Sequence, residues 1–204
     1  MYPNHLGQFQ GRTTVQPAQN SFFVSQETEF VDGIKPPETA AKMVQLAQAA
    51  LVDPEINGMA RFLSKDLIDE QDSPFAAVMS EMQTIYNWVT GKVRYTRDPN
   101  NVELVYSPVQ LLRLIKKYGR WGEDCDSQQL LALVLMMSLG RRCRITIAGF
   151  RKDNPEFFSH VFAEVLVPGI PGYFAPRWIV LDPALRQKVH KMVRHITTVR
   201  YFYP

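Results

Sequence analysis

The most constraining feature of this sequence is an apolar run that begins just after a cysteine. Residues 118–128 contain two glycines followed by acidic and hydroxyl side chains, and residues 129–139 are then largely apolar until Gly140. Asp and Ser side chains can accept hydrogen bonds from the unpaired N–H groups of a first helical turn, so this loop is expected to lead into a helix. Because a helix that is apolar on nearly all sides belongs inside a protein, we predict a central buried helix with Cys125 at its N-terminus.

Cys125 is a candidate nucleophile because of this position. The unpaired N–H groups and the dipole at a helix N-terminus favour negative charge and would stabilise a thiolate. The neighbouring carboxylates of Asp124 and Asp126 oppose that effect, so the thiolate would depend on a nearby imidazolium. Cys143, the second of the two cysteines, falls in an alternating strand pattern and is expected to be a small buried residue.

Length and composition favour a single domain. A chain of 204 residues can form one sizeable core plus an extension, so we expect an arm or tail at 1–37 and a domain at 38–204 with its motif-bearing core at 74–184. The formal net charge is only +3, which argues against nucleic acid as a partner. No stretch approaches the roughly 20 apolar residues of a membrane span, and the N-terminus lacks a signal peptide pattern. We therefore expect a cytoplasmic protein with no membrane partner.

The few cysteines and histidines predict neither a disulfide scaffold nor a metal site. Two cysteines are too few for a small secreted scaffold, so both thiols are expected to be reduced. The four histidines are scattered and show no ligand spacing, so no metal and no cofactor is expected. Residues 1–37 are polar apart from a short cluster around Phe22 and Phe23, and they are either a tail or an arm that docks on a partner.

Helical patterns come first along the chain and strand patterns follow. Apolar residues recur at helical spacing in residues 38–51, 55–68, 73–91 and 107–118. Alternating patterns then predict strands at 142–149, 159–167 and 173–181, while 199–203 is an ambiguous further strand. Helices followed by an antiparallel sheet give an α+β fold.

Two of the predicted strands supply a base and an orienting group for the cysteine. His160 starts one face of the strand at 159–167, and the next strand ends at Asp182, because Pro183 cannot donate to a ladder. If these strands pair across the turn at 168–172, Asp182 lies next to His160, and the Cys125 helix packed on this sheet would bring the sulfur to the imidazole. Each residue alone has an ordinary structural interpretation, since strand histidines are often half-buried and Asp-Pro pairs often start turns.

This order of Cys, His and Asp resembles the transglutaminase-like superfamily of papain-like cysteine enzymes. Further matching motifs surround residues 85–95, 107–112 and 140–150, and the resemblance covers about residues 74–184. It implies a papain-like core in which Cys125 is the nucleophile, His160 the general base and then acid, and Asp182 the orienter of the imidazole.

The resemblance also implies an oxyanion and substrate-binding region beside the cysteine. Backbone N–H groups at the start of the Cys125 helix would bind the oxyanion, and Trp121 and Asp124 would belong to the same region. The sequence departs from the family at one point. The family usually has glycine two residues before the cysteine, where this chain has Glu123 after Gly122.

Two functions of different classes follow from this resemblance. In the first, the protein hydrolyses peptide or amide bonds of a peptide or protein substrate through a thioester on Cys125, with an amine as the alternative acyl acceptor. In the second, the fold serves as a structural or assembly component whose residues 1–37 dock on neighbouring proteins. The chain is similar to compact members encoded by bacteriophages, so a virion component is an example of the second function.

Overall fold

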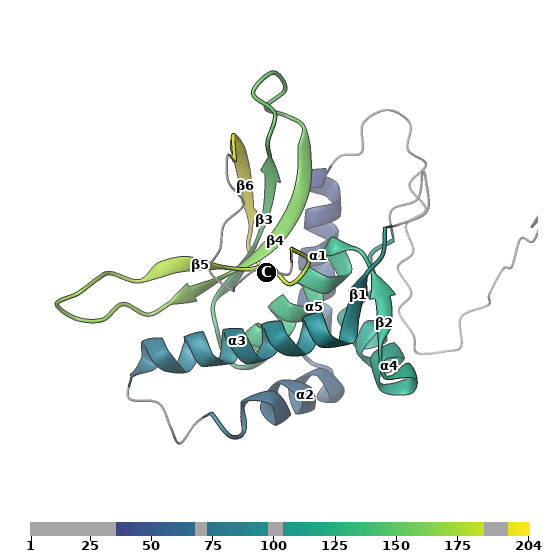
Figure 1. The fold of residues 1–204 in the computed structure, drawn as a ribbon, viewed down its shortest axis with the longest axis vertical. Coiled ribbons are helices and arrows are strands. Elements are labelled where there is room, and N and C mark those ends of the chain that lie inside the picture. The colour runs from purple at the N-terminus through teal and green to yellow at the C-terminus, as the bar shows by residue number, and fades with distance from the viewer. Residues whose placement is uncertain (1–35, 68–72, 98–103, 186–195) are drawn as a thin grey trace, which may run out of the picture.

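The computed structural model describes residues 36–67, 73–97, 104–185 and 196–204, and Figure 1 shows their fold. The arm predicted at 1–37 lies almost entirely outside these residues, so the division into arm and domain stays a prediction. The described helices and strands follow in chain order: α1 (Pro36–Ala50), α2 (Pro54–Ser64), α3 (Pro74–Lys92), β1 (Val93–Tyr95), α4 (Pro108–Tyr118), β2 (Trp121–Glu123), α5 (Cys125–Ser138), β3 (Cys143–Gly149), β4 (Phe158–Val167), β5 (Arg177–Leu181) and β6 (Thr198–Phe202).

The first four helices all begin at a proline. Proline is tolerated at the first helical position because an N–H there would have no partner within the helix. Asp53, Ser73 and Ser107 precede three of these prolines, and each side chain accepts a hydrogen bond from a first-turn N–H of the helix that follows. The two Ser-Pro starts agree with the sequence pattern. Asp53-Pro54 follows α1 and begins the second helix.

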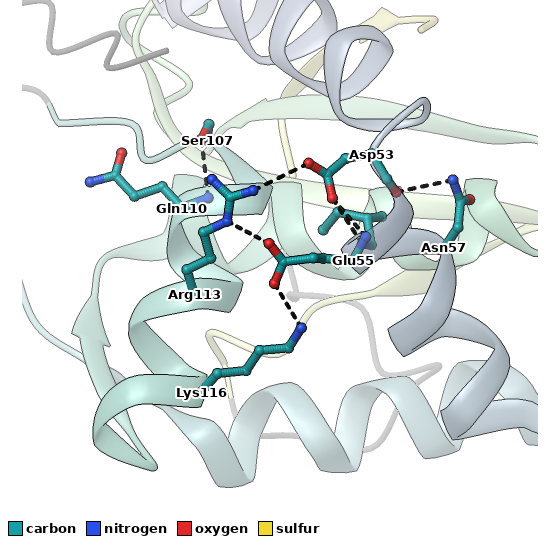
Figure 2. Close-up of polar contacts among 8 residues, drawn as sticks. Asp53, Glu55, Asn57, Ser107, Gln110, Arg113 and Lys116 are labelled. Carbon is teal, nitrogen blue, oxygen red and sulfur yellow. Dashed lines mark hydrogen bonds and ion pairs between the residues drawn. The ribbon is translucent and has the colours of Figure 1, made fainter. Parts of the chain in front are cut away.

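Polar side chains join the start of α2 to α4, as Figure 2 shows. Glu55 accepts hydrogen bonds from Arg113 Nε at 2.6 Å and from Lys116 Nζ at 2.8 Å. Arg113 also lies 3.7 Å from the Asp53 carboxylate. These contacts lower the pKa of the Glu55 carboxyl, and the hydrogen bond from Lys116 is the largest cause. Because the side chains are partly exposed, the network orients α4 on α2 but adds only about 1 kcal/mol or less per pair.

Helix α5 is the centre of the fold. It contacts all the other described helices and also β3, β4 and β5. In Figure 1, α5 lies between the sheet and helices α2, α3 and α4. Residues 130–136 are fully buried, so the prediction of a central apolar helix that begins at Cys125 is confirmed. Burial on all sides fixes the helix and thereby holds Cys125 on a rigid element.

The C-terminal strands form one antiparallel sheet in the order β5-β4-β3-β6. The ambiguous segment at 199–203 is therefore a strand. The segment expected to be a strand at 173–181 is shorter, because the chain around Gly169 makes a tight turn in which Ile170 bridges Phe174. A Cβ at Gly169 would lie 2.5 Å from the Phe174 carbonyl oxygen, so the turn needs glycine at this position.

A second, two-stranded parallel ladder leads into Cys125. The loop before the cysteine contains β2, which pairs with β1 so that Tyr95 lies opposite Glu123. The sequence pattern did not predict β2. A Cβ at Gly122 would lie 2.7 Å from Thr96 Oγ1, so a larger residue there would require the Thr96 side chain to move. The ladder fixes the path of the backbone into α5.

These elements together confirm the predicted α+β fold. N-terminal helices surround α5, and α5 packs on the C-terminal four-stranded antiparallel sheet. Among the described helices, none combines the length and the apolar character needed to cross a bilayer.

Candidate active site

Cys125 opens into a pocket of about 460 Å³ between α1, α5 and the start of β4. The cysteine is the first residue of α5 and is half-buried. His160 lines the same pocket, together with the apolar side chains of Met43, Ile147 and Phe158. The structure therefore brings the two residues that the sequence pattern paired to one cavity with an apolar wall.

His160 and Asp182 meet at the point where β5 ends. His160 Nε2 lies 2.7 Å from Asp182 Oδ2, and Asp182 is only 5% exposed. The predicted proximity of these two residues is confirmed. An ionised carboxylate can only accept, so Nε2 carries the ring proton in this hydrogen bond. The lone pair of the neutral imidazole is then on Nδ1.

The second carboxylate oxygen of Asp182 is held by three donors. Gln129 Nε2 donates to Oδ1 at 2.5 Å, and the backbone N–H groups of Ala184 and Leu185 donate at 3.2 and 3.4 Å. Sequence reasoning missed Gln129. The signal available was a glutamine one turn after Cys125 in a helix expected to be buried, where an amide needs hydrogen-bond partners.

The surroundings of the Cys125 thiol favour its protonated form. Its Sγ donates a hydrogen bond to Asp126 Oδ1 at 3.2 Å. Burial is the largest cause that raises the pKa of Cys125 well above its ordinary value, and the charges of Asp126 and then Asp124 add to it. Burial and the two carboxylates thus oppose the thiolate that the helix N-terminus would favour, as the sequence led us to expect for the carboxylates. Within the described residues, no hydrogen bond joins Sγ to His160.

Comparison with known proteins identifies the family. The family model of the transglutaminase-like superfamily matches residues 61–183, which is more than half of the chain. The chain belongs to the transglutaminase-like superfamily. The matched region runs from the last turns of α2 through Asp182 and includes Cys125 and His160.

Solved structures and curated proteins add less than this family match. A proposed cysteine protease from Cytophaga hutchinsonii is 15% identical with a TM-score of 0.44, over 86% of this chain and 53% of that chain. The structure of Rad4-Rad23 bound to a 6-4 photoproduct UV lesion is 13% identical with a TM-score of 0.36, over 82% of this chain and 46% of that one. The chain thus spans about half the length of these solved chains. No curated protein matches it.

Trp121 and Asp124 were both expected in the oxyanion and substrate-binding region. The structure places them in two different pockets. Asp124 lines the Cys125 pocket but does not cap the first turn of α5. Ser127, the other expected cap, accepts instead from the Tyr106 N–H at 3.0 Å. Trp121 Nε1 donates to Glu123 Oε1 at 2.9 Å, and its ring lines a separate hollow of about 960 Å³. An oxyanion role for Trp121 stays a prediction and requires that hydrogen bond to break.

Cys125 and its two neighbours are also the residues that come closest to a metal-binding set. In the described part of the chain, the ligand atoms of Asp124, Cys125 and Asp126 all lie within 4.8 Å of one another. They are consecutive at one helix start, and a metal held there would occupy the sulfur that the superfamily chemistry needs. The expectation of no metal and no cofactor stays a prediction.

Proposed function

We propose that the protein is a cysteine-dependent acyl-transfer enzyme that hydrolyses peptide or amide bonds through a thioester on Cys125. The observation that supports this most is the 2.7 Å hydrogen bond between His160 and Asp182 at the pocket that Cys125 lines. A base held by a buried carboxylate beside a nucleophile at a helix start is the arrangement that covalent acyl transfer needs.

The proposed reaction uses His160 first as a base and then as an acid. With Nε2–H donated to Asp182, Nδ1 takes the proton of the Cys125 thiol while Sγ attacks the carbonyl carbon of the substrate. The oxyanion would be bound by backbone N–H groups at the start of α5. The tetrahedral intermediate then expels the amine, which takes the proton from His160, and a thioester remains. Water attacks the thioester with His160 again as base, and the acid product and the thiol are released.

A thiol that is protonated at rest must lose its proton to His160 during the catalytic step itself. Since Asp126 holds the Sγ–H, the sulfur must turn from Asp126 toward His160 when substrate binds. The reaction would then resemble that of a serine nucleophile, where the base removes the proton during attack, rather than that of a preformed thiolate-imidazolium pair. The apolar wall of the pocket supports an apolar side chain on the acyl side of a peptide or protein substrate.

The proposal is tested by trapping the thioester. The purified protein is incubated with p-nitrophenyl acetate, quenched in acid and examined by peptide mass spectrometry for a hydroxylamine-sensitive acetyl group. We expect acetylation of Cys125, loss of it in Cys125→Ala, and full retention in the control Cys143→Ala, because Cys143 is buried in β3. Addition of methylamine then separates transfer to water from transfer to an amine. If Cys125→Ala cleaves p-nitrophenyl acetate at the same rate as the wild type, the assignment of Cys125 as the nucleophile is wrong.

A second candidate is a structural or assembly component that keeps the fold without the chemistry. The raised pKa of the Cys125 thiol favours this candidate, since a nucleophile that is hard to ionise is poorly suited to catalysis. Residues 1–37 would dock on neighbouring proteins, for example in a phage virion. Deletion of residues 1–35 separates the two candidates: a free-standing enzyme keeps its acetylation rate, whereas an assembly component loses its partner.

A further inference from the structure

We infer that Gln129 is a positioning residue that fixes Asp182, and through it the His160 tautomer, to the helix that carries Cys125. This inference rests on the proposed function for its catalytic consequence. Gln129 is four residues after Cys125, so both side chains lie on the same face of α5 one turn apart. The same helix would therefore set the nucleophile and the orienting carboxylate.

Gln129 uses both ends of its amide, one toward strand β4 and one toward the residue that follows β5. Nε2 donates to Asp182 Oδ1 at 2.5 Å, and Oε1 accepts from the Ala163 N–H at 3.3 Å. The side chain is 1% exposed. A neutral amide combines a donor and an acceptor at these two atoms, whereas leucine offers neither and an ionised glutamate offers only acceptors.

The second contact of Gln129 lies where β5 ends. The pairing of β4 with β5 stops at Ala163 opposite Leu181, and the next residue, Asp182, turns toward His160. Gln129 of α5 accepts from the Ala163 N–H at this place. The contact therefore joins α5 to the sheet at the point where Asp182 leaves it.

The chemical consequence concerns the carboxylate. Asp182 presents Oδ2 to His160 while Oδ1 is held on the other side, and Gln129 gives the shortest of the three contacts to Oδ1. Without that amide, only the two longer backbone contacts hold Oδ1, so the carboxylate rotates more easily and the preference for the Nε2–H tautomer weakens. Gln129 does not line the Cys125 pocket, so the loss should appear in the rate of acylation and not in binding.

The test compares Gln129→Leu and Gln129→Glu with Leu133→Val, a control one turn further along the same buried helix face. The tautomer of neutral His160 is read from the ¹⁵N shifts of labelled histidine in each folded protein. We expect the Nε2–H tautomer in the wild type and in Leu133→Val, but a mixture in Gln129→Leu. Acylation by p-nitrophenyl acetate should fall by about 10–100-fold in Gln129→Leu with KM unchanged.

Gln129→Glu adds a pH signature that a merely structural residue would not give. Its protonated side chain can still donate to Asp182 Oδ1, whereas its ionised form repels that carboxylate. The acylation rate relative to the wild type should therefore approach one at low pH and fall as pH rises. A wild-type tautomer in Gln129→Leu, or a mixture already in the wild type, would overturn the inference. If the His160 tautomer depends on Gln129 but no thioester forms on Cys125, the inference about Gln129 stands and the proposed function is wrong.

Discussion

Two buried ionic groups lie on the same face of β4 and differ in how completely their polar atoms are engaged. Glu164 pairs with Arg144, and four residues earlier along the strand His160 pairs with Asp182. Residues at even spacing on a strand share a face, and the sheet register places Arg144 opposite Glu164 and Ala148 opposite His160. One sheet face thus carries both groups.

The Arg144 group is closed. Arg144 Nε donates to Glu164 Oε2 at 2.7 Å, and Thr146 donates to the same oxygen at 2.5 Å. The guanidinium lies between the rings of Trp178 and Tyr201, at 4.3 and 3.8 Å from their centres. These contacts join β3, β4, β5 and β6, and neither Arg144 nor Glu164 lines the two pockets described above, so the group is interpreted as a structural clamp.

The His160 group is open on one side. Its carboxylate is fully held by protein donors, but the second ring nitrogen of His160 has no hydrogen-bond partner among the described residues and lines the pocket with Cys125. The comparison suggests a general distinction: a closed ionic group stabilises a fold, and a group with one unused basic atom at a cavity can perform chemistry. Substitutions in the two groups should therefore affect different quantities.

The largest expected effect is on catalysis, from Asp182→Asn. An asparagine amide can donate to His160 Nε2, which moves the ring proton to Nδ1 and removes the base that faces the sulfur. Acylation of Cys125 by p-nitrophenyl acetate should fall by about 10³–10⁴-fold. The midpoint of urea unfolding should change little, because the replacement has the same shape. A variant that keeps more than a tenth of the wild-type rate contradicts the role of Asp182.

A smaller effect, on stability, is expected from Glu164→Gln. The neutral amide leaves the buried Arg144 charge without its anion, and loss of one partner of a buried pair costs about 3 kcal/mol. Urea unfolding measures this loss. The acylation rate of the folded fraction should stay at the wild-type value, since Glu164 does not line the pocket. If Glu164→Gln lowers the acylation rate without lowering stability, the Arg144 and His160 groups do not have the separate roles inferred here.

The features that sequence predicted well depend on local patterns. The helix at Cys125 follows from an unbroken apolar run, and the meeting of His160 with Asp182 follows from two alternating strands with a turn between them. The family resemblance at residues 74–184 agrees with the matched region at 61–183. These features need no knowledge of distant packing.

The features that sequence missed depend on contacts between distant elements. Strand β2 has only three residues and exists because β1 lies beside it. The role of Gln129 depends on how α5 packs against the end of β5, which no local pattern gives. The direction of the Cys125 pKa depends on how deeply the thiol is buried and on the side to which Asp126 turns.

The smallest expected effect comes from Asp126→Asn and concerns the resting state of the nucleophile. Removal of this charge lowers the pKa of the Cys125 thiol toward its ordinary value, because Asp126 raises it both by its charge and by its hydrogen bond. At a fixed pH below the pKa, each unit by which the pKa falls raises the thiolate fraction about tenfold. The iodoacetamide labelling profile of Cys125 should therefore move to lower pH. Burial still opposes ionisation, which limits the shift. Loss of the acidic residue from the first turn of α5 should cost about 0.3–1 kcal/mol of stability. Cys143 in the same sample is the internal control, and an unchanged Cys125 profile would mean that burial alone holds the proton on the sulfur.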